Sequence, residues 1–448
     1  MRVRRLDMLN ALILAAGDGK RMKSSLAKPL HKLAGLAMID HVIRSVRSVN
    51  AHDIAIVASP TLPTIDEAIP TFIQSPPKGT GHAVQCALDW IKTLSGDLLI
   101  LCGDAPLIQP KTLTHLLEQK KNTQADIAVL AADVQGPNQY GRLVLENGDQ
   151  VGAIVEAKEL SAEDIAQQTL CNSGVFLVSV AKLPDLLDQL DDDNASGEFY
   201  LTDIVKLAHG QGLKTTYSLA SEREIQGVNG RADLARAERT FQEITREAML
   251  DNGVTLQAPE TVFFAHDTEI ASDVTIEPNV VFGPGVSIAS GSRIKAFSHL
   301  EGCKISEHVE VGPFARIRPG TVLSEKSKVG NFVELKNTTL GPKSKVNHLS
   351  YCGDTTIGEA SNIGAGTITC NYDGARKHQT TIGDECFIGS NTSLVAPVTI
   401  GNEAVIAAGS TITNHVDDKA LAFARTKQTT LSGKGKVYQD RVKAQKKD

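Results

Sequence analysis

The stretch Ile382–Ile412, IGDECFIGSNTSLVAPVTIGNEAVIAAGSTI, decides the fold of the second half of this chain. An aliphatic residue recurs in it at every sixth position. Neither an α-helix nor an alternating strand repeats at six, because their side-chain periods are about 3.6 and about 2 residues. A period of six is the hexapeptide signature of a parallel β-helix, in which each repeat buries its apolar residue only by stacking on its neighbours.

The same period runs through two further segments, which extends the predicted β-helix over most of the second half. One run is Ile270, Ile276, Phe282, Ile288 and Ile294; the other, after a shift of phase, is Ile305, Val311, Ile317, Leu323, Val329 and Leu335. Glycine often follows the apolar residue, which suits a tight corner because glycine carries no Cβ. Three runs of one spacing make chance a poor explanation.

Composition narrows the possible classes of protein. The 448 residues predict two or three domains at roughly 150 residues each, and 41% of them are hydrophobic, enough for buried cores. The net charge of -6 argues against a general nucleic-acid binder, which needs a clustered basic surface. The seven cysteines form no C-x-x-C pair, which disfavours zinc and disulfide frameworks and favours a reducing compartment.

Neither a membrane span nor a signal peptide is predicted. No apolar run reaches the ~18–20 residues that a spanning helix needs. The start, MRVRRLDMLN, is basic, but the apolar run that follows it is short and ends at glycines. We therefore interpret that run as a first strand.

Up to residue 230 the sequence alternates short apolar strands with helical stretches, as in an α/β domain with a mostly parallel sheet. Expected strands are Asn10–Leu14, Asp53–Val57, Leu98–Cys102 and Ile127–Ala131, and expected helices are Met38–Val49 and Thr112–Lys120. Arg231–Leu250 has helical spacing without internal glycine or proline, and Asn252-Gly253 then stops it.

The predicted fold class is α/β: a Rossmann-like domain followed by a left-handed parallel β-helix of hexapeptide repeats. The expected boundaries are 1–230 for the first domain, 231–251 for a linking helix and 252–448 for the β-helix with its tail. The tail after Ser432 is rich in lysine and polar residues, which is typical of a solvated terminus.

A glycine-rich turn follows the first strand, in LAAGDGKRM over Leu14–Met22, and Lys28-Pro29 comes next. Such a turn lets backbone N–H groups approach phosphate oxygens, and Arg21 and Lys28 add positive charge. The spacing is that of neither the dinucleotide fingerprint nor the P-loop. The predicted strand at Leu98–Cys102 leads directly to Asp104. A carboxylate just past the carboxyl end of a parallel strand lies where open α/β sheets bind ligands.

These motifs resemble the nucleotidyltransferases that make nucleotide sugars. Their signature is G-x-G-(T)-R-M followed by a lysine, and Lys20 stands here where the family usually has threonine. Further segments follow in the family's order: Gln74, Lys78–Ala83, Tyr140–Arg142, Val155-Glu156, Asn172–Gly174 and Gly227–Asn229. Each of these residues alone could have a purely structural role, as Asp104 could in a turn. The ordered set of motifs favours the resemblance.

The resemblance implies a uridylyl transfer in which a sugar 1-phosphate attacks UTP. It implies that Arg21 and Lys28 act at the reacting phosphates and that Asp104 and Asn229 hold Mg²⁺. It also implies a UDP-sugar site made of Leu14, Ala15, Ala16, Gly17, Lys28, Gln74, Gly79, Thr80, Cys102, Gly103, Asp104, Gly141, Glu156, Asn172 and Asn229.

The six-residue period is interrupted twice, by residues 347–354 and by a longer segment that contains residues 369–377. A solenoid places polar chemistry on loops that leave its coils, so these two segments are predicted to form the site. The first contains His348, and a neutral imidazole is a natural base near pH 7.

Four segments, Arg318–Gly320, Val333–Lys336, Asn347–Tyr351 and Gly364–Gly374, resemble the bifunctional bacterial enzymes that acetylate glucosamine 1-phosphate and then uridylylate the product. The resemblance extends from about residue 10 to residue 425. It implies that His348 is the base and that Glu334 orients it. It implies sugar-phosphate contacts by Arg318, Lys336, Tyr351 and Asn362, with charge also from Lys377, and an acetyl-CoA site at Ala365, Asn371, Tyr372, Lys377, Ser390, Ala408 and Arg425.

The same resemblance implies a cytoplasmic homotrimer whose partners are its small-molecule substrates: glucosamine 1-phosphate, N-acetylglucosamine 1-phosphate, UTP and acetyl-CoA. Neither nucleic-acid binding nor membrane insertion is expected. Two other hypotheses compete with this one. A nucleotidyltransferase could use the β-helix only for assembly, against which His348 and the loop at 371–377 argue. A non-enzymatic scaffold could share both folds, against which Gly17–Met22, Lys28 and Asp104 argue.

Overall fold

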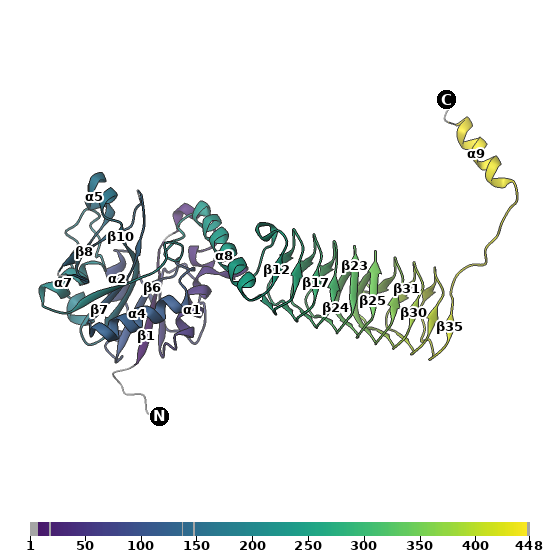
Figure 1. The fold of residues 1–448 in the computed structure, drawn as a ribbon, viewed down its shortest axis with the longest axis horizontal. Helices are drawn as coiled ribbons and strands as arrows, with labels where there is room; N and C mark the ends of the chain where they lie inside the picture. The colour runs from purple at the N-terminus through teal and green to yellow at the C-terminus, as the bar shows by residue number, and fades with distance from the viewer. Residues whose placement is uncertain (1–7, 18, 137, 147, 446–448) are drawn as a thin grey trace. The chain divides into compact units, whose positions relative to one another are not determined.

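The computed structural model describes residues 8–17, 19–136, 138–146 and 148–445. The basic start at 1–7 and Asp18 of the glycine-rich turn lie outside these residues. The chain forms two compact units, Met1–Ile244 and Thr245–Asp448 (Figure 1). Within the described residues, no helix combines the length and the apolar character that crossing a membrane requires.

The first unit is built on a mixed sheet in the order β11-β7-β10-β6-β1-β4-β5, which confirms the α/β class. Its strands are β1 (Leu9–Ala15), β4 (Ile54–Ala58), β5 (Thr71–Ile73), β6 (Asp97–Cys102), β7 (Ile127–Asp133), β10 (Leu170–Ser179) and β11 (Thr215–Leu219). The four predicted strands coincide with β1, β4, β6 and β7. The pairs of β1 with β4 and with β6 are parallel, whereas β10 runs antiparallel between β6 and β7.

Helices pack on both faces of this sheet, so its central strands are buried on both sides, as parallel strands require. In β1, Leu12 joins one apolar cluster while Ala11 and Ile13 join the other. The helices are α1 (Met38–Ser48), α2 (Thr80–Gln85), α3 (Leu88–Ile91), α4 (Pro110–Thr123), α5 (Ala162–Gln167), α6 (Leu183–Leu187) and α7 (Asp203–Gly210). Strands β8 (Arg142–Glu146) and β9 (Gln150–Val155) also belong to this sheet, because β8 pairs with both β10 and β9. The smaller elements are β2 (Lys32–Leu33), β3 (Leu36–Ala37), and the short 3-10 helices η2 (Lys20–Met22), η3 (Lys28–Leu30) and η4 (Ala157–Glu159).

Helix α8 (Arg231–Asp251) covers the range predicted to be helical after the first domain, and Gly253 follows its end. The boundary between the two compact units falls inside this helix. Residues 231–244 therefore belong to the first unit, where Leu234, Ala237 and Phe241 pack with Val228.

The second unit is a parallel β-helix with three faces. One face is the sheet β12 (Thr255–Leu256), β14 (Thr275–Ile276), β17 (Arg293–Ile294), β20 (Glu310–Val311), β23 (Lys328–Asn331), β25 (Lys345–His348), β27 (Asn362–Ile363), β30 (Phe387–Ile388), β33 (Val405–Ile406) and β35 (Leu421–Ala422). The strands of the other two faces are β13 (Glu269–Ile270), β15 (Val281–Phe282), β16 (Ser287–Ile288), β18 (His299–Leu300), β19 (Cys303–Ile305), β21 (Arg316–Ile317), β22 (Thr321–Leu323), β24 (Glu334–Leu340), β26 (Tyr351–Ile357), β28 (Ile368–Cys370), β29 (Thr380–Ile382), β31 (Ser393–Val395), β32 (Val398–Ile400) and β34 (Thr411–Ile412). The turn η5 (Pro259–Thr261) lies near its start and α9 (Lys434–Ala444) near its end.

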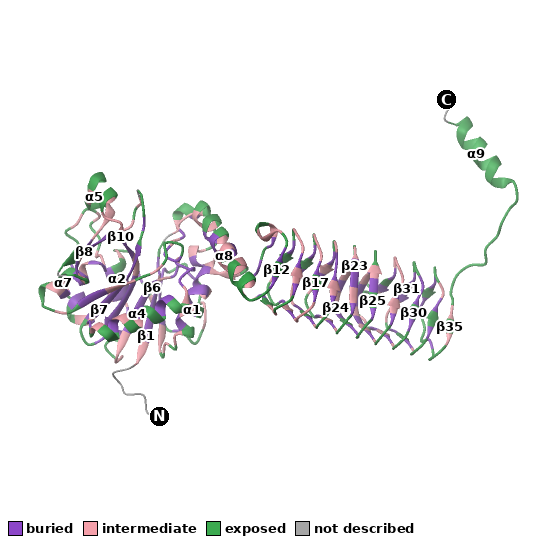
Figure 2. Cartoon of the chain, viewed as in Figure 1, coloured by how far each residue is buried: buried purple, intermediate pink, exposed green. Residues whose placement is uncertain are grey.

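The six-residue period builds the interior of this β-helix. Every residue of the three runs is buried except Ile270, which is half-buried and packs on the same core. Ile276 lies opposite Ile294, eighteen positions later, so three repeats make one coil. Ile288 lies opposite Ile305, seventeen positions later, and such shorter coils explain the shift of phase. In Figure 2 buried positions recur along the coils, whereas α9 is exposed throughout.

One of the two predicted interruptions is wrong. Residues 347–354 do not leave the coil, because the buried Cys352 takes the interior position six residues after Val346. The longer interruption is real, since Ile357 lies opposite Ile382, twenty-five positions later. The extra residues form a loop after β28, and this loop holds Tyr372 and Lys377.

Candidate functional sites

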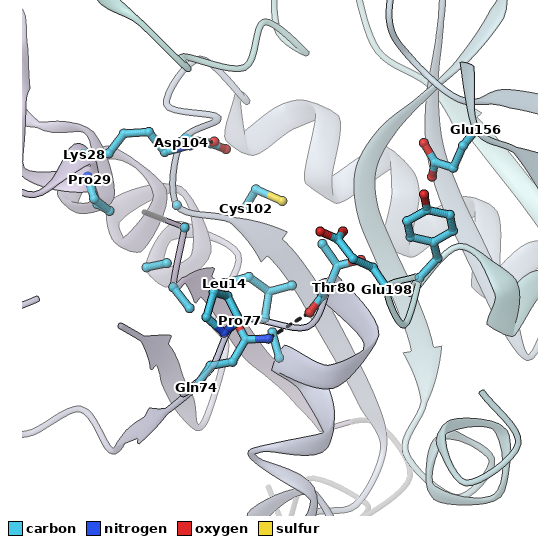
Figure 3. Close-up of a pocket in the computed structure, with 17 residues that line it drawn as sticks. Leu14, Lys28, Pro29, Gln74, Pro77, Thr80, Cys102, Asp104, Glu156 and Glu198 are labelled. Carbon is cyan, nitrogen blue, oxygen red and sulfur yellow. Dashed lines mark hydrogen bonds and ion pairs between the residues drawn. The ribbon is translucent and has the colours of Figure 1, made fainter. Parts of the chain in front are cut away.

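A pocket of ≈ 480 Å³ opens at the carboxyl ends of β1 and β6 in the first unit (Figure 3). Among the predicted residues it is lined by Leu14, Ala15, Ala16, Gly17, Lys28, Gln74, Gly79, Thr80, Cys102, Gly103, Asp104 and Glu156. Strand ends and turns that are distant in the sequence thus meet at one opening. Arg21, Gly141, Asn172 and Asn229 do not line it, although Asn229 lies directly behind Lys28.

Lys28 connects the two residues predicted to hold a metal. Its Nζ contacts Asp104 Oδ2 and donates to Asn229 Oδ1 at 3.2 Å. The oxygens of Asp104, just past β6, and Asn229, just before α8, therefore converge on one positive charge. Carboxylate and amide oxygens are the ligands that a hard divalent cation takes, so this pair fits Mg²⁺. Among the described residues, no group of three or more His, Cys, Asp or Glu side chains is arranged to hold a metal ion.

Glu156 forms the far wall of the pocket, and its carboxylate accepts from Thr202 Oγ1 at 3.0 Å. Burial raises the pKa of Glu156 above its usual value. Gly141 and Asn172 lie behind Glu156, with the Asn172 N–H donating to Gly141 O at 2.8 Å. Arg21, on η2, is exposed.

Two further lining residues, Pro29 and Ala83, belong to the predicted motifs, whereas Pro77, Glu198 and Tyr200 were not predicted from the sequence. Glu198 and Tyr200 belong to a segment without regular structure and without a recognisable motif. Contacts with the turn at Gly79 bring this segment to the pocket; for example, the Phe199 N–H donates to Lys78 O at 2.9 Å. That long-range pairing left no signal in the sequence.

The second candidate site lies on the β-helix around His348, at the end of β25. His348 Nδ1 is 2.8 Å from Oδ1 of Asn331, which occupies the same position one coil earlier. Because an amide oxygen only accepts, the hydrogen of a neutral ring is on Nδ1 and the lone pair is on Nε2. The predicted orienting residue, Glu334, instead pairs with Arg318 at 2.7 Å. Asn331 is thus a site residue that the sequence reasoning missed.

Four residues predicted for acetyl-CoA continue from His348 in one column across successive coils. The Gly366 N–H, beside Ala365, donates to His348 O at 3.3 Å, and the Asn391 N–H, beside Ser390, donates to Ala365 O at 2.8 Å. The Gly409 N–H, beside Ala408, then donates to Ser390 O at 2.8 Å. Arg425 closes the column by donating from its guanidinium to Ala408 O at 2.8 Å.

The positively charged residues lie on a neighbouring face. The ammonium groups of Lys336 and Lys377 are close together, and Lys377 lowers the pKa of Lys336. Asp354 opposes these charges. Although burial disfavours its ionised form, hydrogen bonds from Asn337 and Asn371 hold the pKa of Asp354 below its usual value.

Tyr351 and Asn371 crowd around Gly353, where a Cβ would overlap Tyr351 Oη and Asn371 Nδ2. The predicted Asn362 is not brought to this face. It lies in β27, opposite Lys345 and Phe387 in the other sheet. Tyr372 is exposed on the loop after β28.

Comparisons with known proteins agree with both units. A family described as the MobA-like NTP transferase domain matches residues 11–201, and the hexapeptide repeat of succinyl-transferase matches residues 379–414. The chain is similar to the bifunctional protein GlmU of Sphingopyxis alaskensis, with 46% identity over 441 residues that cover 97% of each chain. It is 46% identical to that of Zymomonas mobilis, over 97% of this chain and 98% of the relative. It is 47% identical to that of Sinorhizobium fredii, over 97% and 96%.

Proposed function

Since the chain belongs to the family of bifunctional GlmU proteins, we propose that it carries out two transfers in sequence. Acetyl-CoA first acetylates the amine of glucosamine 1-phosphate. The N-acetylglucosamine 1-phosphate formed then attacks UTP and gives UDP-N-acetylglucosamine and pyrophosphate. The second unit performs the first transfer and the first unit performs the second.

The column from His348 to Arg425 is the observation that carries the acetyl transfer. An extended thioester cofactor that lies along it would present its acetyl group beside His348 and its charged end beside Arg425. Nε2 of His348 has the free lone pair, so it takes the proton as the amine attacks the thioester carbonyl. The positive charges of Lys336, Lys377 and Arg318 hold the sugar phosphate nearby, and Glu334 fixes the guanidinium of Arg318.

Asn331 positions the base, so replacing it with alanine should slow acetyl transfer. We expect Asn331→Ala to lower kcat for acetyl transfer about tenfold to a hundredfold, as is typical when the partner that orients a histidine is lost. The KM for glucosamine 1-phosphate should stay unchanged, because Asn331 does not bind the sugar. Steady-state kinetics of Asn331→Ala and Asn331→Asp measure this split. The aspartate variant keeps an acceptor for Nδ1 and should retain more activity; equal losses in both variants contradict the assigned role.

In the first unit, Asp104 and Asn229 would hold Mg²⁺. When bound, the ion supplies positive charge to the triphosphate and to the pyrophosphate that leaves. Lys28 neutralises charge at the reacting phosphates, together with Arg21 and the backbone N–H groups of the glycine-rich turn. Gln74, Gly79 and Thr80 surround the base, and Glu156 lies beside the sugar, with Gly141 and Asn172 outside the lining. Positioning and charge neutralisation therefore account for the proposed catalysis.

A homotrimer with acetyl-CoA sites between neighbouring β-helices completes the proposal. Its support is a ladder of exposed rings at one corner, formed by Phe297, Phe314 and Phe332. Their centroids stack at 4.9 and 5.1 Å, and the exposed Leu349 continues the ladder on the next coil. An apolar strip of this kind is typical of a contact between subunits. We infer a cytoplasmic location from the substrates.

A substrate-omission assay tests the proposed function. The purified protein is incubated with glucosamine 1-phosphate, acetyl-CoA, UTP and Mg²⁺, and each is omitted in turn. UDP-N-acetylglucosamine should form only in the complete mixture. Replacing glucosamine 1-phosphate and acetyl-CoA together by N-acetylglucosamine 1-phosphate should restore it. Uridylyl transfer without any acetyl transfer would favour the alternative of a monofunctional nucleotidyltransferase, against which the pairing of His348 with Asn331 argues.

A further inference from the structure

Gln74 is the buried polar side chain at the base end of the nucleotide pocket. It is only 4% exposed, yet it lines the pocket. Both hydrogens of its amide nitrogen are committed, since Nε2 donates to Gly79 O at 2.9 Å and to His82 Nδ1 at 3.1 Å. The dashed line in Figure 3 marks the bond to Gly79. The amide oxygen Oε1 is what remains to meet a ligand.

The Gly79 carbonyl is itself held rigidly. Gly79 has a φ of +100°, and a Cβ there would lie 2.5 Å from Phe199 O and 2.9 Å from Phe199 N. The Gly81 N–H donates to Phe199 O at 2.8 Å. Glycine is therefore required at position 79, and the carbonyl cannot turn away from Gln74 without breaking this packing.

The amide orientation also depends on the protonation of His82. Its Nδ1 accepts from Gln74 only when the ring is neutral with its hydrogen on Nε2, which lies 3.9 Å from Cys86 Sγ. Burial and the ammonium of Lys78 lower the pKa of His82, and the thiol of Cys86 stays protonated because burial raises its pKa. The carboxylate of Glu198 lies on the segment that packs against this turn. The neutral ring is thus the ordinary state near pH 7.

We propose that His82 is a positioning residue that selects uracil by fixing the amide of Gln74 with Oε1 toward the base. This inference rests on the proposed uridylyl transfer and adds the origin of its base preference. Uracil carries a hydrogen on N3 and donates it to Oε1. Cytosine has a lone pair on N3, so two acceptors would face each other. Turning the amide over would instead set Oε1 against the carbonyl of Gly79 and lose both hydrogen bonds of Nε2.

The test compares UTP with CTP as substrates for N-acetylglucosamine 1-phosphate. We expect His82→Ala to lower the ratio of kcat/KM for UTP to kcat/KM for CTP about tenfold, the effect of one oriented hydrogen bond. His82→Asn should preserve the ratio, because Oδ1 of asparagine takes the place of Nδ1 and accepts from Gln74. In the wild type the ratio should also fall as the pH decreases below about 6.5, the ordinary pKa of histidine, because the pKa of His82 is lowered. In His82→Asn it should stay flat.

His209 provides a matched control. It is a half-buried histidine whose Nδ1 also lies within reach of a glutamine Nε2, that of Gln150 at 3.3 Å, but away from the pocket. His209→Ala should leave the UTP-to-CTP ratio unchanged. Acetyl transfer by the second unit reports whether each variant is folded. An unaltered ratio in a folded His82→Ala overturns the proposal, whereas a wild type that transfers no UMP at all overturns the proposed function instead.

Discussion

We expect His348→Ala to abolish acetyl transfer and to leave uridylyl transfer intact. No other variant proposed here should slow acetyl transfer as much. Removing a positioned general base costs about 10²–10⁴ in rate. The residue is exposed and its imidazole contacts Asn331, so its loss leaves the β-helix packed. Separate assays measure CoA release from glucosamine 1-phosphate and pyrophosphate release from N-acetylglucosamine 1-phosphate. Only the first should disappear.

His415→Ala serves as the control for this variant. His415 is also exposed on the β-helix, and its Nδ1 likewise contacts an acceptor one coil earlier, Thr399 O at 3.1 Å. It lies outside the column that begins at His348. It should therefore keep both activities. Loss of both activities in a folded His348→Ala protein would sink the two-site model, because the two reactions would then share one centre.

The interior of the β-helix was predictable because it repeats. Each coil needs a buried apolar residue every six positions, because its interior is filled by stacking. Apolar residues such as Ile276, Ile294 and Val311 therefore predict the coils without information about distant segments. The false interruption at 347–354 arose where a cysteine fills the interior position. Cys352 is as buried as its aliphatic neighbours, but a period read from aliphatic residues passes over it.

In the α/β unit, the strands and helices could be predicted from the sequence, but the order in which the strands pair could not. Apolar runs revealed β1, β4, β6 and β7, whereas the antiparallel insertion of β10 between β6 and β7 depends on which strand edge remains free in three dimensions. Local patterns carry no information about that choice.

Site residues that stand in local motifs could also be predicted, whereas those that act through contacts between coils could not. Asp104 and Lys28 stand in local motifs, and the structure joins them. Asn331 and Asp354 do not stand out in the sequence, because they act on residues seventeen positions away, one coil removed: Asn331 on His348 and Asp354 on Asn371. Pairing of this kind becomes visible only once the length of each coil is known. That length varies from seventeen to twenty-five residues near the site.

In contrast to His348→Ala, the variant Asp104→Asn should abolish uridylyl transfer and leave acetyl transfer intact. The amide keeps the shape of the carboxylate but removes the charge that, in the proposed site, Asp104 would offer to a cation shared with Asn229. Charge stabilisation by a bound metal contributes several kcal/mol, so a loss of about a thousandfold in kcat/KM is expected. A second readout is binding: calorimetric titration with Mg²⁺ and UTP should show weaker uptake of the metal, independently of turnover.

The control for Asp104→Asn lies at the opposite end of the strand that Asp104 follows. Asp97, at the other end of β6, pairs with the nearly buried Lys120 at 2.8 Å, as Asp104 pairs with the nearly buried Lys28. Asp97→Asn therefore removes a comparable Lys–Asp pair, and its melting temperature measures how much the loss of such a pair destabilises the unit. It should reduce the melting temperature about as much as Asp104→Asn does, yet keep uridylyl transfer. If Asp97→Asn also lost that activity, the effect of Asp104 would reflect the integrity of the sheet, and its assignment to the metal would fail.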